Sequence, residues 1–173
     1  MVSAIAAVSP DWGIGDGKGM LYRLPGDLKY FRSVTLGHPV IMGRKTLESF
    51  PGGKPLPGRE NIVITRNRNF HPEGVTVVHS LAALRRLLAA RPDETFFVIG
   101  GGEIYEKLLP DCDTAYLTMV ETPPPIAPTV FFPDLSKKRS WEMISLSEPH
   151  SEDNGAVYRF SLWRRKRIAP KEI

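Results

Sequence analysis

The sequence predicts a single-domain α/β fold built around a mainly parallel sheet. Short apolar or β-branched runs alternate along the chain with segments of helical pattern, as they do in α/β proteins. The chain has 173 residues, which is enough for one domain with a full core. No helix separates the last two strand-like runs, residues 141–146 and 157–163, so we expect them to pair antiparallel at one edge of the sheet.

The first half of the chain already shows this alternation. Residues 2–8 form an apolar run typical of a buried strand, and a glycine-rich loop at residues 9–20 follows. Residues 25–35 are expected to be helical, because Pro25 suits a first helical position. The next expected elements are a strand at 39–43, a short helix at 44–50 and a strand at 61–65.

The second half continues the pattern. A strand is expected at residues 75–79, and Ser80 is placed to cap a helix at 81–90 whose leucines recur on one face. The remaining expected elements are strands at 96–100, 114–120, 141–146 and 157–163 and a helix at 102–109. We place the domain at residues 1–165 and a basic tail end at 166–173.

Composition narrows the class of protein. The only cysteine is Cys112, so no disulfide can form within the chain, which fits a reducing compartment. The apolar run at 2–8 is too short for a signal peptide or a membrane span, so we expect a cytoplasmic protein. The net charge of +4 is modest. The basic group at 164–167 has no accompanying nucleic-acid-binding motif, so a solvated chain end is favoured over a nucleic-acid arm.

Several familiar motifs are absent. A dinucleotide fingerprint fails because Tyr105 stands where the third glycine after Gly100 and Gly102 would be, and a Walker A loop fails at Pro55. The four histidines lack metal-ligand spacing, so no metal is expected. There is no C-x-x-C and no G-x-S-x-G, which leaves zinc and serine-hydrolase chemistry without support.

Three other segments favour an anionic ligand. The strand at 96–100 runs into three glycines and a helix, an arrangement that suits a pyrophosphate better than a simple tight turn. Arg44, Lys45 and Thr46 open the helix at 44–50, where cations oppose the helix dipole unless an anion binds there. Arg66 ends the strand at 61–65 and could hold a second phosphate, although such an arginine is usually solvated.

Asp27 presents a choice between two interpretations. In LYRLPGDLKYF, residues 21–31, it falls in the first helical turn with Phe31 one turn further on. An acid in this position commonly complements the helix dipole. From these residues alone that interpretation is favoured over a carboxylate held in an apolar pocket for chemistry.

The motifs, in this order, resemble the dihydrofolate reductase family, in its bacterial chromosomal type. The resemblance covers essentially the whole chain and is carried by IAAVSPDWGIG at 5–15, LPGDLKYFR at 24–32, PVIMGRKTLESF at 39–50, PLPGRENIVITR at 55–66, VIGGGEIYEKLLP at 98–110, YLT at 116–118 and FFPD at 131–134. It implies a three-layer fold with a mostly parallel eight-stranded sheet, an antiparallel C-terminal edge and flanking helices. It also implies NADPH-dependent reduction of 7,8-dihydrofolate by a monomer that antifolates inhibit.

The resemblance assigns substrate and catalytic roles by position. Asp27 would bind the pteridine 2-amino group and N3, Thr118 would support that carboxylate, and Arg59 would hold the glutamate carboxylate of the substrate. The residues matched to the ring and benzoyl pocket are Ile5, Ala7, Leu28, Phe31, Phe50, Leu56 and Ile99. Tyr22 and Met20 complete the expected catalytic set.

The resemblance also assigns a cofactor site. Thr65 and Arg66, with Arg44 and Thr46, would surround the adenosine 2′-phosphate and the pyrophosphate. The full expected set is Ala7, Ile14, Gly15, Gly19, Met20, Gly43, Arg44, Lys45, Thr46, Thr65, Arg66, His79, Ile99, Gly100, Gly101, Gly102, Glu103, Ile104 and Tyr105. The family's cis Gly-Gly bond would fall at Gly101–Gly102.

The implied reaction moves a hydride from the nicotinamide C4 to the pteridine C6 and a proton to N5. Asp27 would stabilise the charge that develops on the ring, and water admitted beside Met20 would donate the proton. Tyr22 stands where the family usually has tryptophan, Leu21 where proline is common, and Thr129 where some members carry an acid that closes the loop.

Two other functions remain as alternatives. A pyrimidine reductase of riboflavin synthesis would share the fold and cofactor, but it needs no pterin-pairing carboxylate such as Asp27. A catalytically silent nucleotide-binding or RNA-binding module would use the basic C-terminus, and its RNA affinity would fall steeply with salt.

Overall fold

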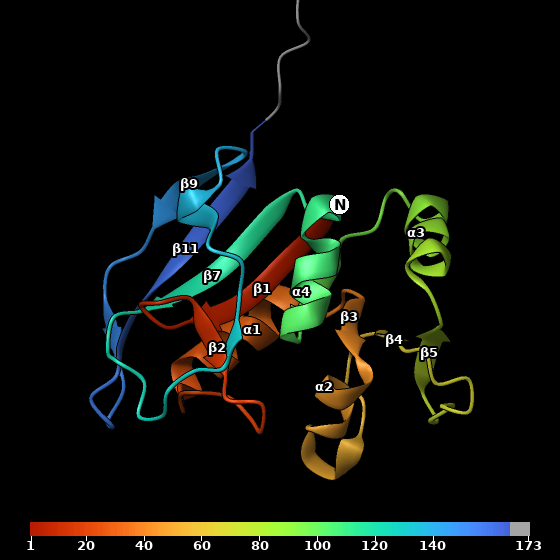
Figure 1. The fold of residues 1–173 in the computed structure, drawn as a ribbon, viewed down its shortest axis with the longest axis horizontal. Helices are drawn as coiled ribbons and strands as arrows, with labels where there is room; N and C mark the ends of the chain where they lie inside the picture. The colour runs from red at the N-terminus through yellow and green to blue at the C-terminus, as the bar shows by residue number, and fades with distance from the viewer. Residues whose placement is uncertain (167–173) are drawn as a thin grey trace, which may run out of the picture.

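A computed structural model describes residues 1–166 as a twisted sheet with helices on both faces (Figure 1). The strands run in the order β10-β11-β7-β1-β6-β3-β4-β5. Their bounds are β1 Val2–Val8, β3 Val40–Gly43, β4 Asn61–Ile64, β5 Val75–Val78, β6 Phe96–Gly100, β7 Thr114–Val120, β9 Trp141–Leu146, β10 His150–Ser151 and β11 Val157–Arg165. Both β9 and β10 pair with β11, so the nine strands occupy eight positions across the sheet.

The strand directions confirm the predicted fold class. The pairs β1–β6, β1–β7, β3–β6, β3–β4 and β4–β5 are parallel. Within this sheet the antiparallel pairs are those that β11 makes with β7, β9 and β10, at the C-terminal edge where the absence of an intervening helix predicted antiparallel pairing. The basic tail expected at 166–173 lies, apart from Lys166, outside the described residues.

The helices form the two outer layers. They are α1 Pro25–Thr35, α2 Arg44–Glu48, α3 Leu81–Ala90 and α4 Gly102–Leu108, with single 3₁₀ turns η1 Pro51–Gly53, η2 Leu109–Asp111 and η3 Leu135–Lys137. Leu84 of α3 and Leu108 of α4 belong to one core cluster, whereas Phe31 and Val34 of α1 pack against another. The helices therefore bury their apolar faces in separate halves of the core.

The capping of the helices differs. Ser80 caps α3 as predicted, because its Oγ accepts a hydrogen bond from the Ala83 N–H at 3.0 Å. The N-cap of α1 is Leu24, which has no side chain that can accept one. Within residues 1–166, no helix has the length and apolarity needed to cross a membrane.

One small sheet was not predicted. β2, Gly13–Gly15, lies inside the expected glycine-rich loop and pairs antiparallel with β8, Val130–Phe131. Three residues, two of them glycine, carry no strand periodicity, and their partner lies far along the chain. The pairing matters because it fixes the base of the loop that contains Met20.

Candidate active site

Most of the predicted cofactor residues meet at one edge of the sheet. The carboxyl ends of β1, β3, β4 and β6 point the same way, because these strands form a parallel series. The register pairs Gly43 with Ile64 and Met42 with Gly100, so the segments that follow these strands begin side by side. Ligands of open α/β sheets bind at this kind of edge.

The three glycines after β6 have different reasons to be glycine. Gly100 has a φ of +117°, and a Cβ there would meet the Tyr105 ring at 3.1 Å. A Cβ on Gly102 would lie 2.5 Å from Val130 Cγ1, inside β8. At Gly101 a Cβ would meet only Thr46 Oγ1, at 3.8 Å. Gly100 is therefore required by its backbone conformation and Gly102 by the contact with β8, whereas a Cβ on Gly101 would make only an ordinary contact with α2.

The location of the cis peptide bond corrects one expectation. The structure places it at Gly100–Gly101, whereas the resemblance predicted Gly101–Gly102. Because Gly100, Gly101 and Gly102 are identical, a motif match cannot tell which of the two Gly-Gly bonds is the cis one. The predicted position was wrong by one residue.

Two short helices begin at this edge without side-chain caps. The N-caps of α2 and α4 are Gly43 and Gly101, and neither helix receives a capping hydrogen bond from a side chain. Their first backbone N–H groups are therefore available to an anion. The two helix starts also face each other, since a Cβ on Gly101, the N-cap of α4, would lie 3.8 Å from Thr46 Oγ1 of α2.

The basic residues of this edge are not equivalent. Arg44 forms an ion pair with Glu48 at 2.7 Å, so its charge is already partly neutralised. Glu103 pairs with Lys107, which is the main reason that its pKa is lowered, and the charges of Arg66 and Lys45 lower that pKa further. Arg66 and Lys45 thus add positive potential at the start of α4.

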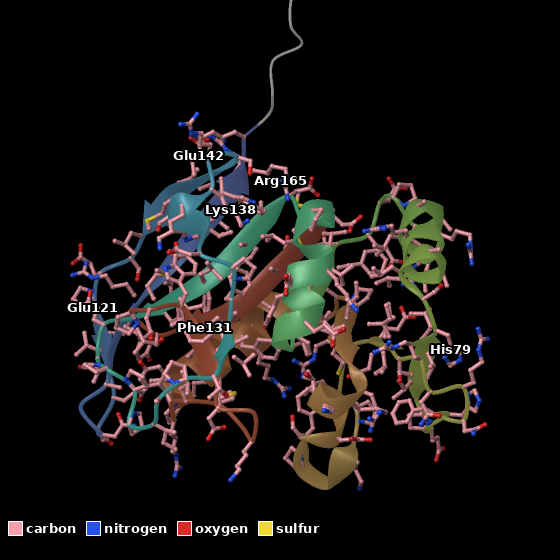
Figure 2. All side chains as sticks on the ribbon, viewed as in Figure 1. His79, Glu121, Phe131, Lys138, Glu142 and Arg165 are labelled. Carbon is pink, nitrogen blue, oxygen red and sulfur yellow. The ribbon has the colours of Figure 1, made fainter. Side chains whose placement is uncertain are left out.

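The outer end of this edge carries two histidines. The Nδ1 of His79 lies 2.9 Å from the Thr65 carbonyl oxygen, which ties the end of β5 to the end of β4. The rings of His79 and His71 are 6.3 Å apart. Figure 2 shows His79 beside β5, at the far side of the molecule from Glu121. The predicted residues Thr65 and Arg66 directly follow β4, and His79 directly follows β5, with His79 joined to Thr65.

Asp27 does not cap its own helix. Its Oδ1 accepts a hydrogen bond from Thr118 Oγ1 at 2.5 Å, and Thr118 is a buried residue of β7 that pairs with Ala7 in the sheet. Burial raises the pKa of Asp27, the Thr118 hydrogen bond opposes that change, and the charge of Glu152 adds to it. Within residues 1–166 no Lys, Arg or His forms a salt bridge with Asp27. Asp27 does lie in the first turn of α1, but its burial and its hydrogen bond to Thr118 go beyond what complementing the helix dipole requires.

The apolar side chains expected to bind substrate belong to two different core clusters. One core cluster contains buried Ile5, and several other residues expected to bind substrate pack against it, namely Phe31, Phe50, Leu56 and Ile99. Ala7 and Tyr22 pack instead against the cluster that contains Leu24 and Tyr158. Leu28 is 52% exposed on α1, the same helix that carries Asp27 and Phe31.

Arg59 is a partly buried cation near the same apolar cluster. Its Nη1 donates to Thr35 Oγ1 at 3.1 Å and its Nε donates to the Pro57 carbonyl at 3.1 Å. Its guanidinium lies 6.0 Å from the Phe31 ring centroid. Burial, and secondarily the charge of Arg32, lowers the pKa of Arg59. No carboxylate within residues 1–166 pairs with Arg59. An anionic ligand would therefore stabilise the charge of this partly buried guanidinium.

The loop with Met20 is held at its base by the backbone. Thr129 N–H donates to the Gly15 carbonyl at 2.9 Å, where the resemblance would place an acidic side chain in some members. Asp16 Oδ1 accepts from the N–H groups of Lys18 and Gly19, both at 2.9 Å, which folds the loop on itself. Met20 is 69% exposed. The β8 segment that anchors this loop ends at Phe131, which Figure 2 shows near α4.

Two predicted tyrosines have hydroxyl groups already engaged. Tyr22 donates to the Thr122 carbonyl at 2.7 Å, and burial raises the pKa of Tyr22 to about 12. Tyr105 is buried and donates to the Ile5 carbonyl at 2.7 Å, which fixes α4 against β1. Neither proton is free to reach a ligand unless these bonds break.

Sequence reasoning missed one charged residue of this site. Glu152 lies between β10 and β11 and accepts a hydrogen bond at 2.7 Å from the N–H of Gly26. Gly26 immediately precedes Asp27 in the chain. No local motif marks Glu152. The only available signal was Gly26 itself, a poor helix former in the first turn of a helix.

The fold and this geometry define an α/β protein that has two helix starts without side-chain caps at one edge of its sheet and a partly buried carboxylate, Asp27, with no basic partner among residues 1–166. The family model for dihydrofolate reductase matches residues 1–165. The chain belongs to the dihydrofolate reductase family.

Individual relatives agree with the family match. The chain is 38% identical to dihydrofolate reductase type 3 of Salmonella typhimurium over 96% of this chain and 99% of the relative. It is 36% identical to dihydrofolate reductase of Bacillus subtilis, covering 96% and 95%. Among solved structures, dihydrofolate reductase from Enterococcus faecalis complexed with NADP(H) and RAB-propyl superposes with a TM-score of 0.82 at 31% identity, covering 96% and 97%.

Proposed function

We propose that this protein reduces 7,8-dihydrofolate to tetrahydrofolate with NADPH, as a cytoplasmic monomer. The observation that carries the proposal is Asp27, a partly buried carboxylate that accepts a hydrogen bond from Thr118 and has no basic partner among the described residues. Membership of the family and the names of the relatives support the same activity.

The edge of the sheet fits the phosphates of NADPH. The absence of a side chain at Gly101, the uncapped starts of α2 and α4, and the charges of Lys45 and Arg66 all favour a pyrophosphate there. Thr65, Arg66 and His79 are proposed to meet the adenosine end, because they directly follow β4 and β5, the last two strands of the sheet on this side. When bound, NADPH supplies the hydride. The residues proposed to line its nicotinamide end are Ala7, Ile14, Gly15, Gly19, Met20 and Ile99.

The other side of the site fits a basic heterocycle with an anionic tail. Asp27 would accept hydrogen bonds from the ring while Thr118 holds one of its oxygens. The apolar residues around Ile5 would contact the ring and the benzoyl group. Arg59 would bind the tail carboxylate, which gives that cation the partner it lacks among residues 1–166.

The proton needed at N5 has no obvious side-chain donor. Tyr22 donates its proton to the Thr122 carbonyl, which leaves water as the donor. The negative charge of Asp27 raises the proton affinity of a ring held against it, so protonation becomes easier as hydride arrives. The exposed Met20 lies on the loop that would admit and then exclude this water.

The test is a coupled loss of dihydrofolate and NADPH absorbance with purified protein. Turnover that requires both compounds is the expected result, and no turnover at any pH from mildly acidic to mildly alkaline would contradict the proposal. Methotrexate separates the activities, because a pterin-shaped inhibitor should bind tightly next to Asp27. A pyrimidine reductase of riboflavin synthesis would not bind methotrexate tightly, and an RNA-binding module would show neither turnover nor methotrexate binding.

A further inference from the structure

The first turn of α1 is held by a residue from the other end of the chain. Leu24 at the N-cap offers no acceptor, and Asp27 is turned toward Thr118. The Gly26 N–H, one of the donors that a helix start leaves without an intrahelical partner, donates instead to Glu152 Oε1 at 2.7 Å. A carboxylate at this position also complements the helix dipole.

The carboxylate of Glu152 is itself held in place by a second hydrogen bond, from Tyr158. Tyr158 Oη donates to the same Oε1 at 2.7 Å, and Tyr158 is 3% exposed, with its ring packed edge-on against Phe160. The hydrogen bond from Tyr158, and next the one from Gly26, lowers the pKa of Glu152, so this carboxylate stays ionised. Asn154, in the same turn as Glu152, makes a second contact with this segment: its Nδ2 donates a hydrogen bond to the Arg23 carbonyl at 2.9 Å.

Gly26 makes this approach possible. A Cβ on Gly26 would lie 2.3 Å from Tyr158 Oη and 2.8 Å from Glu152 Oε1. Its φ is not positive, so glycine is needed here for close approach and not for conformational freedom. Glycine in the first turn of α1 is thus explained by Tyr158 and Glu152.

We propose that Glu152 is a positioning residue for the reaction, which acts on Asp27 by holding the backbone of Gly26 and by placing a second negative charge behind the pocket. The inference rests on the proposed function, because it assigns Glu152 a part in the work of Asp27. Gly26 immediately precedes Asp27, so any drift of this N–H moves the carboxylate that must meet the ring. A misplacement of this kind lowers turnover without removing a single ligand contact.

The charge of Glu152 acts on the proton chemistry as well. The groups that face Asp27 or its partner are Thr118 from β7, Tyr30 and Lys29 from α1, Tyr105 from α4, and Tyr158 from β11. Burial raises the pKa of each of these three tyrosines, so they are uncharged, and Lys29 acts on Glu152. Glu152 is therefore the anion that adds to the proton affinity of the pocket.

Glu152→Gln tests the charge, and Asp153→Asn is its matched control. Asp153 is the exposed neighbour in the same turn, so both variants lose one negative charge from the same hairpin. Glu152→Gln retains an oxygen that can accept from Gly26. We expect its pH profile of hydride transfer to shift to lower pH, because less negative charge weakens proton binding in the pocket, while Asp153→Asn follows the wild type. Equal profiles for all three proteins would overturn the inference.

A double-mutant cycle tests the positioning. Gly26→Ala should lower kcat/KM about tenfold, the cost of about one charged hydrogen bond. Tyr158→Phe removes the nearer of the two atoms that the new methyl group would strike and leaves Cζ at 3.6 Å, while Glu152 Oε1 stays at 2.8 Å, so the double variant should recover part of the loss. A double variant whose loss equals the product of the two single losses would contradict the proposed contact.

Two readouts separate this inference from the proposed function. The Gly26 amide resonance should move in Glu152→Ala whether or not turnover is measured, and an unmoved resonance contradicts the contact. A wild type that does not turn over dihydrofolate contradicts the proposed function and, with it, the role of Glu152. An active wild type whose Glu152→Gln variant matches Asp153→Asn contradicts the inference alone.

Discussion

The two sides of the proposed active site are assembled in different ways. On the phosphate side each segment follows directly from a parallel strand, as α2 follows β3 and α4 follows β6. On the Asp27 side the carboxylate is held by Thr118 from β7 and, through Gly26, by Glu152 from the last hairpin. Substitutions on the first side should affect one ligand, whereas substitutions on the second should affect position, charge and stability together.

Asp27→Asn should lower turnover more than any other substitution considered, and it should also change the pH dependence of turnover. The variant keeps an oxygen for Thr118 but loses the charge, so turnover at neutral pH should fall about 100-fold or more, the scale seen when one preorganised electrostatic group is removed. Activity should partly recover at acidic pH, where the substrate arrives already protonated. Steady-state rates across pH measure this, and full activity at neutral pH would remove Asp27 from the mechanism.

Arg59→Gln should be more selective. The lost interaction is a charge-assisted hydrogen bond to the substrate tail, so the KM for dihydrofolate should rise about 10–100-fold while kcat changes little. A pterin that lacks the glutamate should bind wild type and variant alike, which makes it the internal control. An equal loss for both ligands would show that Arg59 supports the pocket and not the tail.

Gly101→Ala and Gly102→Ala compare two neighbours on the phosphate side. Gly102→Ala should lower stability by about 1–3 kcal/mol, because its methyl group would strike Val130. Gly101→Ala should leave the thermal midpoint nearly unchanged, because its methyl group would make only an ordinary contact with Thr46, and should weaken NADPH binding about tenfold, because that methyl group would stand where the pyrophosphate is proposed to bind. Thermal unfolding and NADPH titration by fluorescence distinguish the two. The same loss of stability in both variants would mean that Gly101 serves only the turn.

The same contrast explains how much was predictable from the sequence. The antiparallel pairing at the C-terminal edge, the cap at Ser80 and the junctions of β3 with α2 and β6 with α4 follow from local patterns, and the structure has them where expected. The binding of phosphate at these junctions stays a prediction. The β2–β8 pair, the cis bond at Gly100–Gly101 and the contact between Glu152 and Gly26 depend on partners or registers that no local pattern encodes. Asp27 falls between these cases, because the resemblance named Thr118 as its partner, whereas nothing in the sequence pointed to Glu152.

Asp27 should also carry a small cost in stability. Burial raises its pKa above the unfolded value, so between those two values the folded protein binds more protons than the unfolded chain. Stability from this group is therefore greatest below the unfolded pKa and declines as pH rises through the folded pKa. Asp27→Asn should then unfold at a higher temperature than the wild type at neutral pH, with a difference that vanishes in acid where Asp27 is protonated. Thermal scans at both pH values measure it, with Asp153→Asn as an exposed control that should show no such difference. A variant less stable than the wild type at neutral pH would mean that the Thr118–Asp27 hydrogen bond outweighs the burial of the charge.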